Sequence, residues 1–132
     1  MSHSGEYVII GISKKAIGID IEKKEYSRKI LKISFRFFNK REHMALENEK
    51  NKKKQYDLFY FLWTQKEAIT KGKGNSILLN SKTTEVALTR PPKYKSKKYS
   101  THWTLEELAM GNNYSGIIAA NQDIQSIKYI DF

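Results

Sequence analysis

The segment from residue 56 to residue 71, YDLFYFLWTQKEAITK, constrains the fold more than any other part of the chain. Its first half is apolar on nearly all sides and its second half is amphipathic, which is typical of a helix that runs through a core. Gly72 follows directly, as is common just after a helix ends. The sequence therefore predicts a central, buried helix over residues 56–71.

Two β-branched runs precede this helix, at residues 6–12 and 16–21. A short polar segment, Ser13-Lys14-Lys15, separates them. Such an arrangement indicates a β-hairpin, because β-branched residues favour strands and polar residues favour the turn. We expect a sheet to begin here.

Shorter helices are predicted between these strands and the central helix. The apolar positions of residues 26–38 favour one helix. Asn39, with Glu42 three residues later, matches a capping box for a second helix that ends near Glu49. Residues 48–54 carry dense charge and no apolar side chain, which indicates an exposed loop.

The remainder of the chain is predicted to be mostly strands, broken at Pro91-Pro92 and at residues 111–113. The predicted strands are residues 83–89, 98–105, 114–121 and 126–130. With the earlier elements they predict an α+β fold in which helices are inserted into a largely antiparallel sheet. A length of 132 residues suits one domain that covers residues 1–132.

The composition excludes several classes of function. The chain has no cysteine, so disulfides, thiolate metal sites and cysteine nucleophiles are excluded, and a reducing cytoplasm is the expected compartment. No segment approaches the roughly 18 apolar residues of a membrane span, and the first residues lack the layout of a signal peptide. We therefore expect no membrane partner.

The charge balance favours an anionic partner. Subtracting 14 acidic from 24 basic side chains gives a net charge of +10. Such a field attracts nucleic acid, phosphate groups or an acidic protein, and it does not distinguish among them. A solvated basic surface explains many of the lysines equally well.

Asp20 and Glu22 lie two residues apart in a predicted strand, so their side chains leave the same face. They can therefore converge on one cation, and Mg²⁺ prefers such carboxylate oxygens. Solvated acids on an edge strand are the alternative interpretation of this pair.

Trp63, Glu67 and Lys71 follow one another at intervals of four residues on the central helix, which places them on one face. Glu67 and Lys71 can then act together. An ordinary helical ion pair worth only about 0.2–0.5 kcal/mol is the alternative. Trp63 is compatible with a place in the core.

The two motifs occur in one combination, IGIDIE at 17–22 and WTQKEAITKG at 63–72, with 40 residues between them. This combination resembles the two-part signature of the 4'-phosphopantetheinyl transferases. SHSG at 2–5, RFFNKREH at 36–43 and YSGIIAA at 114–120 resemble further segments of that family, in its large, surfactin-synthetase-activating type.

The resemblance implies an enzyme that transfers the 4'-phosphopantetheine arm of coenzyme A to a serine of an acyl or peptidyl carrier protein, a holo-[acyl-carrier-protein] synthase. It implies that Asp20, Glu22 and Glu67 hold Mg²⁺. It also implies that Glu67 is the general base, which takes the serine proton directly or through a metal-bound water. Lys71 matches a lysine that contacts phosphates, and His3 matches a histidine that meets a phosphate of coenzyme A.

The chain departs from the large type in one respect. SHSG lies near the middle of those enzymes and stands at residue 2 here, so we expect the chain to correspond to their C-terminal, catalytic half. A homo-oligomer, a separate N-terminal half, or an inactive remnant that only docks carrier proteins are the open alternatives.

A small basic module that binds RNA or DNA is the competing class of protein. The net charge and the tract from Lys93 to Tyr99 favour it. It gives no reason for Asp20, Glu22, Glu67 and Lys71 to occur at the family spacing, so we do not expect nucleic acid as the partner.

Overall fold

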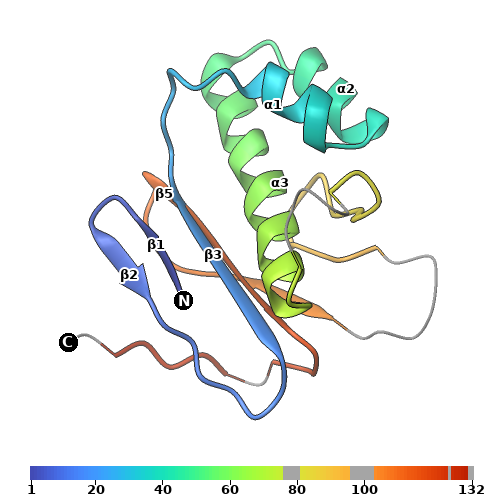
Figure 1. The fold of residues 1–132 in the computed structure, drawn as a ribbon. Coiled ribbons are helices and arrows are strands. Elements are labelled where there is room, and N and C mark those ends of the chain that lie inside the picture. The colour runs from blue at the N-terminus through green and yellow to red at the C-terminus, as the bar shows by residue number, and fades with distance from the viewer. Residues whose placement is uncertain (76–80, 96–102, 125, 131–132) are drawn as a thin grey trace.

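The computed structural model describes residues 1–75, 81–95, 103–124 and 126–130. A three-stranded antiparallel sheet has the order β3 (Ile17–Lys23), β5 (Tyr114–Ala120), β4 (Thr104–Glu107). The long helix α3 (Lys52–Gly72) lies across one face of this sheet (Figure 1). The predicted α+β fold class with antiparallel strands is therefore confirmed.

The central helix is α3, and it begins one turn earlier than the sequence suggests. The side chain of Asn51 accepts a hydrogen bond from the Lys54 amide at 3.0 Å and so caps the helix at its N-terminus. The exposed loop predicted over residues 48–54 is thus wrong in its second half, because lysines are good helix formers once a cap is present. The helix ends at Gly72, which agrees with the prediction to within one residue.

Two short helices, α1 (Ile30–Phe37) and α2 (Lys40–Asn48), lie near the N-terminal end of α3 (Figure 1). The predicted capping box is confirmed: the Glu42 amide donates to Asn39 Oδ1 at 2.8 Å, and the Asn39 amide donates to Glu42 Oε1 at 3.0 Å. Both hydrogen bonds satisfy amides that a helix start otherwise leaves without partners.

Helix α1 begins later than the predicted residue 26. Tyr26 is instead held against α3, where its hydroxyl donates to Asp57 at 3.3 Å and its ring packs on Tyr56. These tertiary contacts keep the segment before Ile30 out of the helix, so the helical pattern is realised only in its second part.

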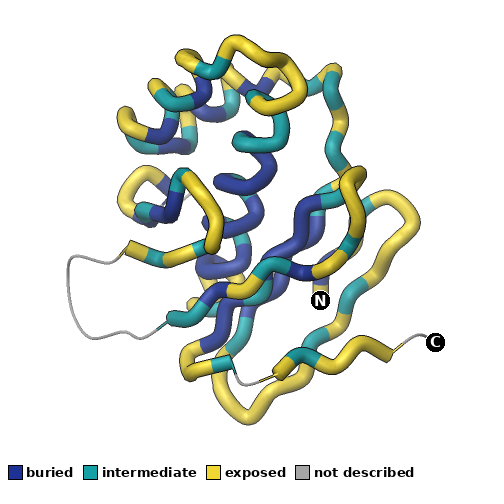
Figure 2. The backbone as a smooth tube through the Cα atoms, turned by 180° about the vertical axis from the view of Figure 1, so that it is seen from behind, coloured by how far each residue is buried: buried dark blue, intermediate teal, exposed yellow. Residues whose placement is uncertain are grey.

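The predicted hairpin of residues 6–12 and 16–21 is wrong. The hairpin instead joins β1 (Ser2–Ser4) to β2 (Tyr7–Ile9) through Gly5, whose φ of 54° is a left-handed conformation that glycine adopts readily. Strand β3 pairs along its whole length with β5, far away in the sequence. The largely buried β3 thus takes a distant partner, whereas most of the link over residues 10–16 is exposed (Figure 2).

The late strands are confirmed in part. The prediction over 114–121 corresponds to β5. The prediction over 98–105 overlaps β4 only at residues 104 and 105, because β4 continues to Glu107, and residues 98–102 lie outside the described residues. Residues 83–89 form only an isolated bridge, and residues 126–130 form no strand. The predicted break at 111–113 is a turn with Gly111 at a φ of 79°.

The core lies between α3 and the sheet and continues beneath α1 and α2 (Figure 2). Phe38 stacks on Phe59 with ring centroids 5.6 Å apart, which joins the turn after α1 to the central helix. The buried apolar cluster comprises Ile30, Phe38, Leu46, Phe59, Tyr60, Phe61, Leu62, Ala68, Ile69, Val86, Leu105, Ile117 and Ala119. Among the described residues, no helix combines the length and the apolar character that crossing a membrane requires.

Candidate functional site

Strand β3 turns alternate residues toward α3, and Gly18 is the point of closest approach. A Cβ atom at Gly18 would stand only 1.9 Å from the carbonyl oxygen of Ala68 on the helix. Glycine therefore lets strand and helix backbones touch. Asp20 and Glu22 follow on the same face of the strand, so the close contact brings both carboxylates against α3.

Helix α3 meets this face with the predicted row of side chains. The Lys71 ammonium donates to Asp20 Oδ1 at 2.8 Å, and the Trp63 indole N–H donates to Glu22 Oε1 at 3.3 Å. Glu67, between them along the helix, is half-buried. The structure thus brings the four predicted residues Asp20, Glu22, Glu67 and Lys71 to one contact between β3 and α3.

Asp20 is the most unusual side chain at this contact. It is only 2% exposed, and its Oδ2 is the one buried side-chain polar atom among the described residues that lacks a hydrogen-bond partner. Burial first and the nearby Glu22 second raise the pKa of Asp20 from 3.8 to about 8, while Lys71 acts in the opposite direction. Asp20 therefore favours its protonated form at neutral pH unless more positive charge is supplied.

Glu67 experiences the same environment. Burial raises the pKa of its carboxyl, Lys71 lowers it, and the charge of Glu22 raises it again. The three carboxyl groups are thus close enough for their charges to interact, and the Lys71 ammonium does not offset the burial of Asp20 and Glu67. The site is short of positive charge.

The chemistry of these donors fits a divalent cation such as Mg²⁺, which prefers hard carboxylate oxygens and binds few of them. The buried Asp20 Oδ2, which none of the described residues contacts by a hydrogen bond, is a suitable ligand atom. Within the described residues, however, no three acidic or histidine side chains are arranged in a group that could hold a metal ion. The side chains are therefore of the chemical type that binds Mg²⁺. In the structure, the positive charge beside Asp20 is the Lys71 ammonium.

His3, predicted to meet a coenzyme A phosphate, lies on β1. Its neighbours Ser2 and Ser4 turn toward β3, where their hydroxyls accept hydrogen bonds from the amides of Ile21 at 3.1 Å and Lys23 at 2.8 Å. His3 alternates with them, so its exposed side chain leaves the other side of the strand. Its role stays a prediction.

Lys66 has a structural place, although it stands beside Glu67 in the motif and its role was left open by the sequence. It is fully buried, its ammonium lies 2.8 Å from Glu42 Oε1, and it donates to the carbonyl oxygens of Ser81 and Thr84. Lys66 therefore joins α3 to α2 and to residues 81–84, on another side of the helix from Lys71.

Sequence reasoning missed two further contributors, Ser2 and the indole N–H of Trp63. The Lys71 ammonium donates to Ser2 Oγ at 3.4 Å, in addition to its bond with Asp20. The spacing of Trp63 and Glu67 on one helix face could have indicated the contact with Glu22. Nothing in the local sequence indicates the contact between Ser2 and Lys71, because it depends on how β1 lies beside β3.

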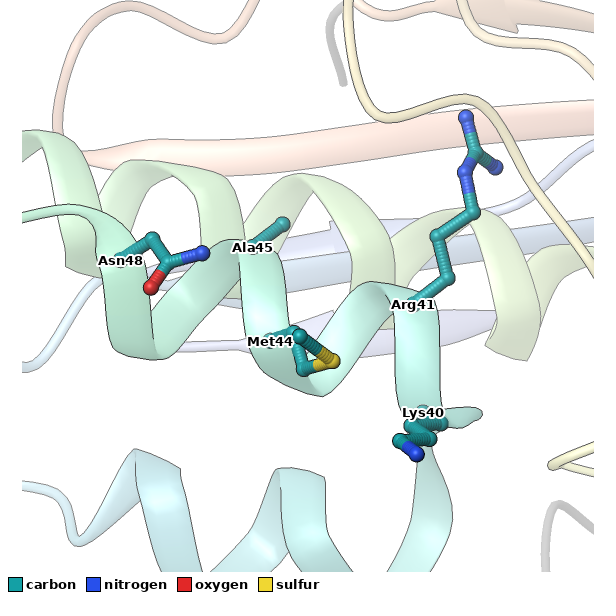
Figure 3. Close-up of a pocket in the computed structure, with 5 residues that line it drawn as sticks. All are labelled: Lys40, Arg41, Met44, Ala45 and Asn48. Carbon is teal, nitrogen blue, oxygen red and sulfur yellow. The ribbon is translucent and has the colours of Figure 1, made fainter.

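A hollow of about 560 Å³ lies elsewhere, on the outer side of α2. Figure 3 shows its lining residues, Lys40, Arg41, Met44, Ala45 and Asn48, with the Arg41 guanidinium directed away from the helix. Arg41 contacts Glu85 at 3.5 Å. None of these residues belongs to the contact between β3 and α3, so this hollow and the cluster of acidic side chains are separate features.

Comparison with known proteins gives one consistent result. A model of the 4'-phosphopantetheinyl transferase superfamily matches residues 16–119, more than half of the chain. The 4'-phosphopantetheinyl transferase Sfp of Bacillus subtilis (strain 168) is 48% identical over 83 residues, which are 61% of this chain and 36% of Sfp.

Two further relatives agree. The 4'-phosphopantetheinyl transferase ffp of Bacillus subtilis is 45% identical over 83 residues, 61% of this chain and 36% of ffp. The 4'-phosphopantetheinyl transferase gsp of Aneurinibacillus migulanus is 38% identical over 100 residues, 74% of this chain and 41% of gsp. The chain spans less than half the length of each of these relatives.

Proposed function

Because this chain belongs to the 4'-phosphopantetheinyl transferase superfamily, we propose that it carries the catalytic centre for transfer of 4'-phosphopantetheine from coenzyme A to a serine of an acyl or peptidyl carrier protein. The observation that carries the proposal is the contact between β3 and α3. Three carboxyl groups and one ammonium meet there, and a buried oxygen of Asp20 has no partner within the part of the chain that the structure describes.

Asp20, Glu22 and Glu67 are the proposed ligands of Mg²⁺. When bound, the ion would neutralise negative charge on the phosphate oxygens at the reacting phosphorus. The raised pKa values of Asp20 and Glu67 support this assignment, because carboxyl groups that are short of positive charge gain most from a cation. Trp63 keeps Glu22 directed at this point through its indole N–H.

The proposed reaction is a displacement at phosphorus. The serine oxygen forms a bond to the phosphorus next to the pantetheine arm, the anhydride bond breaks, and adenosine 3',5'-bisphosphate leaves with that electron pair. Glu67 accepts the proton of the serine hydroxyl. Because a cation beside Glu67 would lower its basicity, the proton can reach it directly or through a metal-bound water.

Lys71 and His3 are the proposed contacts for coenzyme A. Lys71 is partly exposed, with 36% of its side chain accessible, so a phosphate can approach it at the end of α3. An ammonium supplies compact positive charge, which suits a site rich in oxygen atoms. His3 is also exposed, on the neighbouring strand β1.

The overall charge of the chain supports the proposed partners. Coenzyme A carries phosphates, and a net charge of +10 favours encounter with it and with an acidic carrier protein. We also assign the chain to the cytoplasm, since it contains no cysteine that an oxidising compartment would pair.

The direct test incubates the purified chain with coenzyme A, Mg²⁺ and an apo carrier protein, and detects the phosphopantetheine adduct by mass spectrometry. The chain is assayed over a wide concentration range, so that self-assembly can complete the site, and several carrier proteins are compared. We expect adduct on the carrier serine. Absence of adduct in every combination would overturn transfer by this chain alone.

A pair of variants then tests the residue assignment. Glu67→Gln removes a ligand and a base at nearly constant size, and should lower the transfer rate by about a hundredfold or more. Glu106→Gln, the same change at an exposed position of β4, should leave the rate unchanged. Equal rates for the two variants would remove Glu67 from the mechanism.

A further inference from the structure

We propose that Ser2 is a positioning residue for Lys71: its hydroxyl holds the ammonium at the edge of the site so that Lys71 can bind a phosphate of coenzyme A. This inference rests on the function proposed above for Lys71. It assigns a role to the hydroxyl of Ser2, the first serine of the SHSG motif. The proposed function gives this hydroxyl no role.

The position of Ser2 is fixed by the fold. It is 6% exposed, and its Oγ accepts a hydrogen bond from the amide of Ile21, the residue between Asp20 and Glu22 in the sequence. The hydroxyl therefore lies against the segment of β3 that carries the acidic side chains. From there it also accepts a hydrogen bond from the Lys71 ammonium at 3.4 Å.

The two oxygens that hold Lys71 differ in charge. Asp20 is a titratable acid, whereas Ser2 is neutral and fixes the ammonium without cancelling its positive charge. An ammonium has three N–H donors, and within the described part of the chain two of them reach Asp20 and Ser2. A third donor is left for a phosphate oxygen.

The hydrogen bond from Lys71 to Ser2 is important because a lysine side chain is flexible. Lys71 stands in the last turn of α3, where it is partly exposed and would otherwise sample several rotamers. Ordering a long side chain costs free energy when a ligand binds, so a side chain that is ordered beforehand binds more tightly.

Ser4 offers a matched control. Its hydroxyl also accepts a hydrogen bond from a β3 amide, that of Lys23 at 2.8 Å, and it also lies on β1. Ser2→Ala and Ser4→Ala therefore each remove one hydrogen bond between β1 and β3. Of these two serine hydroxyls, that of Ser2 accepts a hydrogen bond from the Lys71 ammonium.

The first experiment measures the affinity for coenzyme A in the presence of Mg²⁺ by calorimetry. Ser2→Ala should weaken binding about three- to tenfold, as expected for a long hydrogen bond to a charged group. Ser4→Ala should change it less than about twofold. Ser2→Ala should also lower the thermal midpoint more than Ser4→Ala, because the Ile21 amide is buried and the Lys23 amide is exposed. Ser2→Thr retains the hydroxyl and should restore binding.

A double-mutant cycle separates positioning from general loosening of the fold. In a Lys71→Ala background, Ser2→Ala should have no further effect on coenzyme A affinity, because the group it positions is gone. An undiminished effect in that background, or equal losses for Ser2→Ala and Ser4→Ala, would overturn the proposal.

A second readout works without any ligand. Nitrogen-15 NMR of the lysine ammonium groups should show restricted motion of Lys71 in the wild type and in Ser4→Ala, and greater motion in Ser2→Ala. Unchanged motion in Ser2→Ala would overturn the positioning role even if coenzyme A binds. If the wild type fails to bind coenzyme A but the NMR result is as expected, the proposed function is contradicted. The restriction of Lys71 by Ser2 would then still be established.

Discussion

Helix α3 carries two ion pairs of the same length whose surroundings differ. Lys66 contacts Glu42 and Lys71 contacts Asp20, each with nitrogen and oxygen 2.8 Å apart. In the first pair, the carboxylate oxygens of Glu42 also accept hydrogen bonds from the backbone amides of Asn39 and Val86. Around the second, one buried oxygen of Asp20 has no partner among the described residues.

The difference indicates which pair is structural and which is prepared for a ligand. A buried ion pair is well accommodated when further hydrogen bonds satisfy its remaining donors and acceptors, and this holds for Lys66 and Glu42. The pair of Lys71 and Asp20 stays incomplete and partly open to solvent. Perturbed acids with unsatisfied atoms occur preferentially at functional sites, where a ligand completes them.

The largest expected effect comes from breaking the satisfied pair. Lys66→Met preserves the volume of the side chain but leaves the fully buried Glu42 without its cation, and should lower the free energy of unfolding by about 3–5 kcal/mol. Urea denaturation measures this change. Lys71→Met should lower the free energy of unfolding at neutral pH by less than about 1 kcal/mol, because Asp20 favours its protonated form there and is not left as a buried charge. A similar loss in both variants would remove the distinction between the pairs.

Removing the acid of the incomplete pair should have the opposite sign. Asp20→Asn abolishes the need to bury a charge, and at pH 9 without added metal it should raise the free energy of unfolding by an amount on the order of a few kcal/mol. Chemical denaturation in a metal-free buffer is the measurement. A clear loss of stability at that pH would show that the pair with Lys71 already compensates for burial.

The pH dependence of stability sharpens the same contrast. The pKa of Asp20 is raised from 3.8 to about 8, so between these values the folded chain retains a proton that the unfolded chain releases. The contribution of Asp20 to stability should therefore be fully present below pH 3.8 and decline as the pH rises toward 8. The difference between wild type and Asp20→Asn, measured by thermal denaturation across this window, isolates that contribution. A difference that does not vary with pH would contradict the raised pKa.

A smaller effect is expected at Trp63. Trp63→Phe retains an aromatic ring that can stack on Phe59, and it removes the N–H that holds Glu22. Loss of one hydrogen bond to a carboxylate should weaken Mg²⁺ binding by about three- to tenfold. Calorimetric titration with Mg²⁺ tests this, and Trp103→Phe provides the control at the other tryptophan. Unchanged affinity in Trp63→Phe would show that Glu22 needs no such support.

The sequence is most informative where local pattern and tertiary environment agree. The central helix and the Asn39 capping box are fixed by residues within a few positions of each other, and both are confirmed. The hairpin prediction failed because the choice of strand partner is not local: β3 pairs with β5, which lies more than 90 residues further along the chain. Alternation along a strand still placed Asp20 and Glu22 correctly on one face.

In the candidate site, too, some features follow from the local sequence and others depend on tertiary contacts. The spacing of Trp63, Glu67 and Lys71 predicts a common helix face, and the structure has that face against β3. The support from Ser2 could not be predicted from spacing, because it depends on β1 lying beside a strand with which it forms no ladder. The burial of Lys66 also depends on tertiary contacts, with Glu42 and the carbonyls of residues 81 and 84.

The most direct test of the central claim is a Mg²⁺ titration of the nitrogen-15-labelled chain followed by amide chemical shifts. We expect saturable shifts concentrated at residues 18–22 of β3 and 67–72 of α3, small shifts around Glu42, and loss of the response in Asp20→Asn. A response centred on other acidic residues, or an undiminished response in Asp20→Asn, would contradict the claim that the incomplete pair on α3 is where the ligand binds.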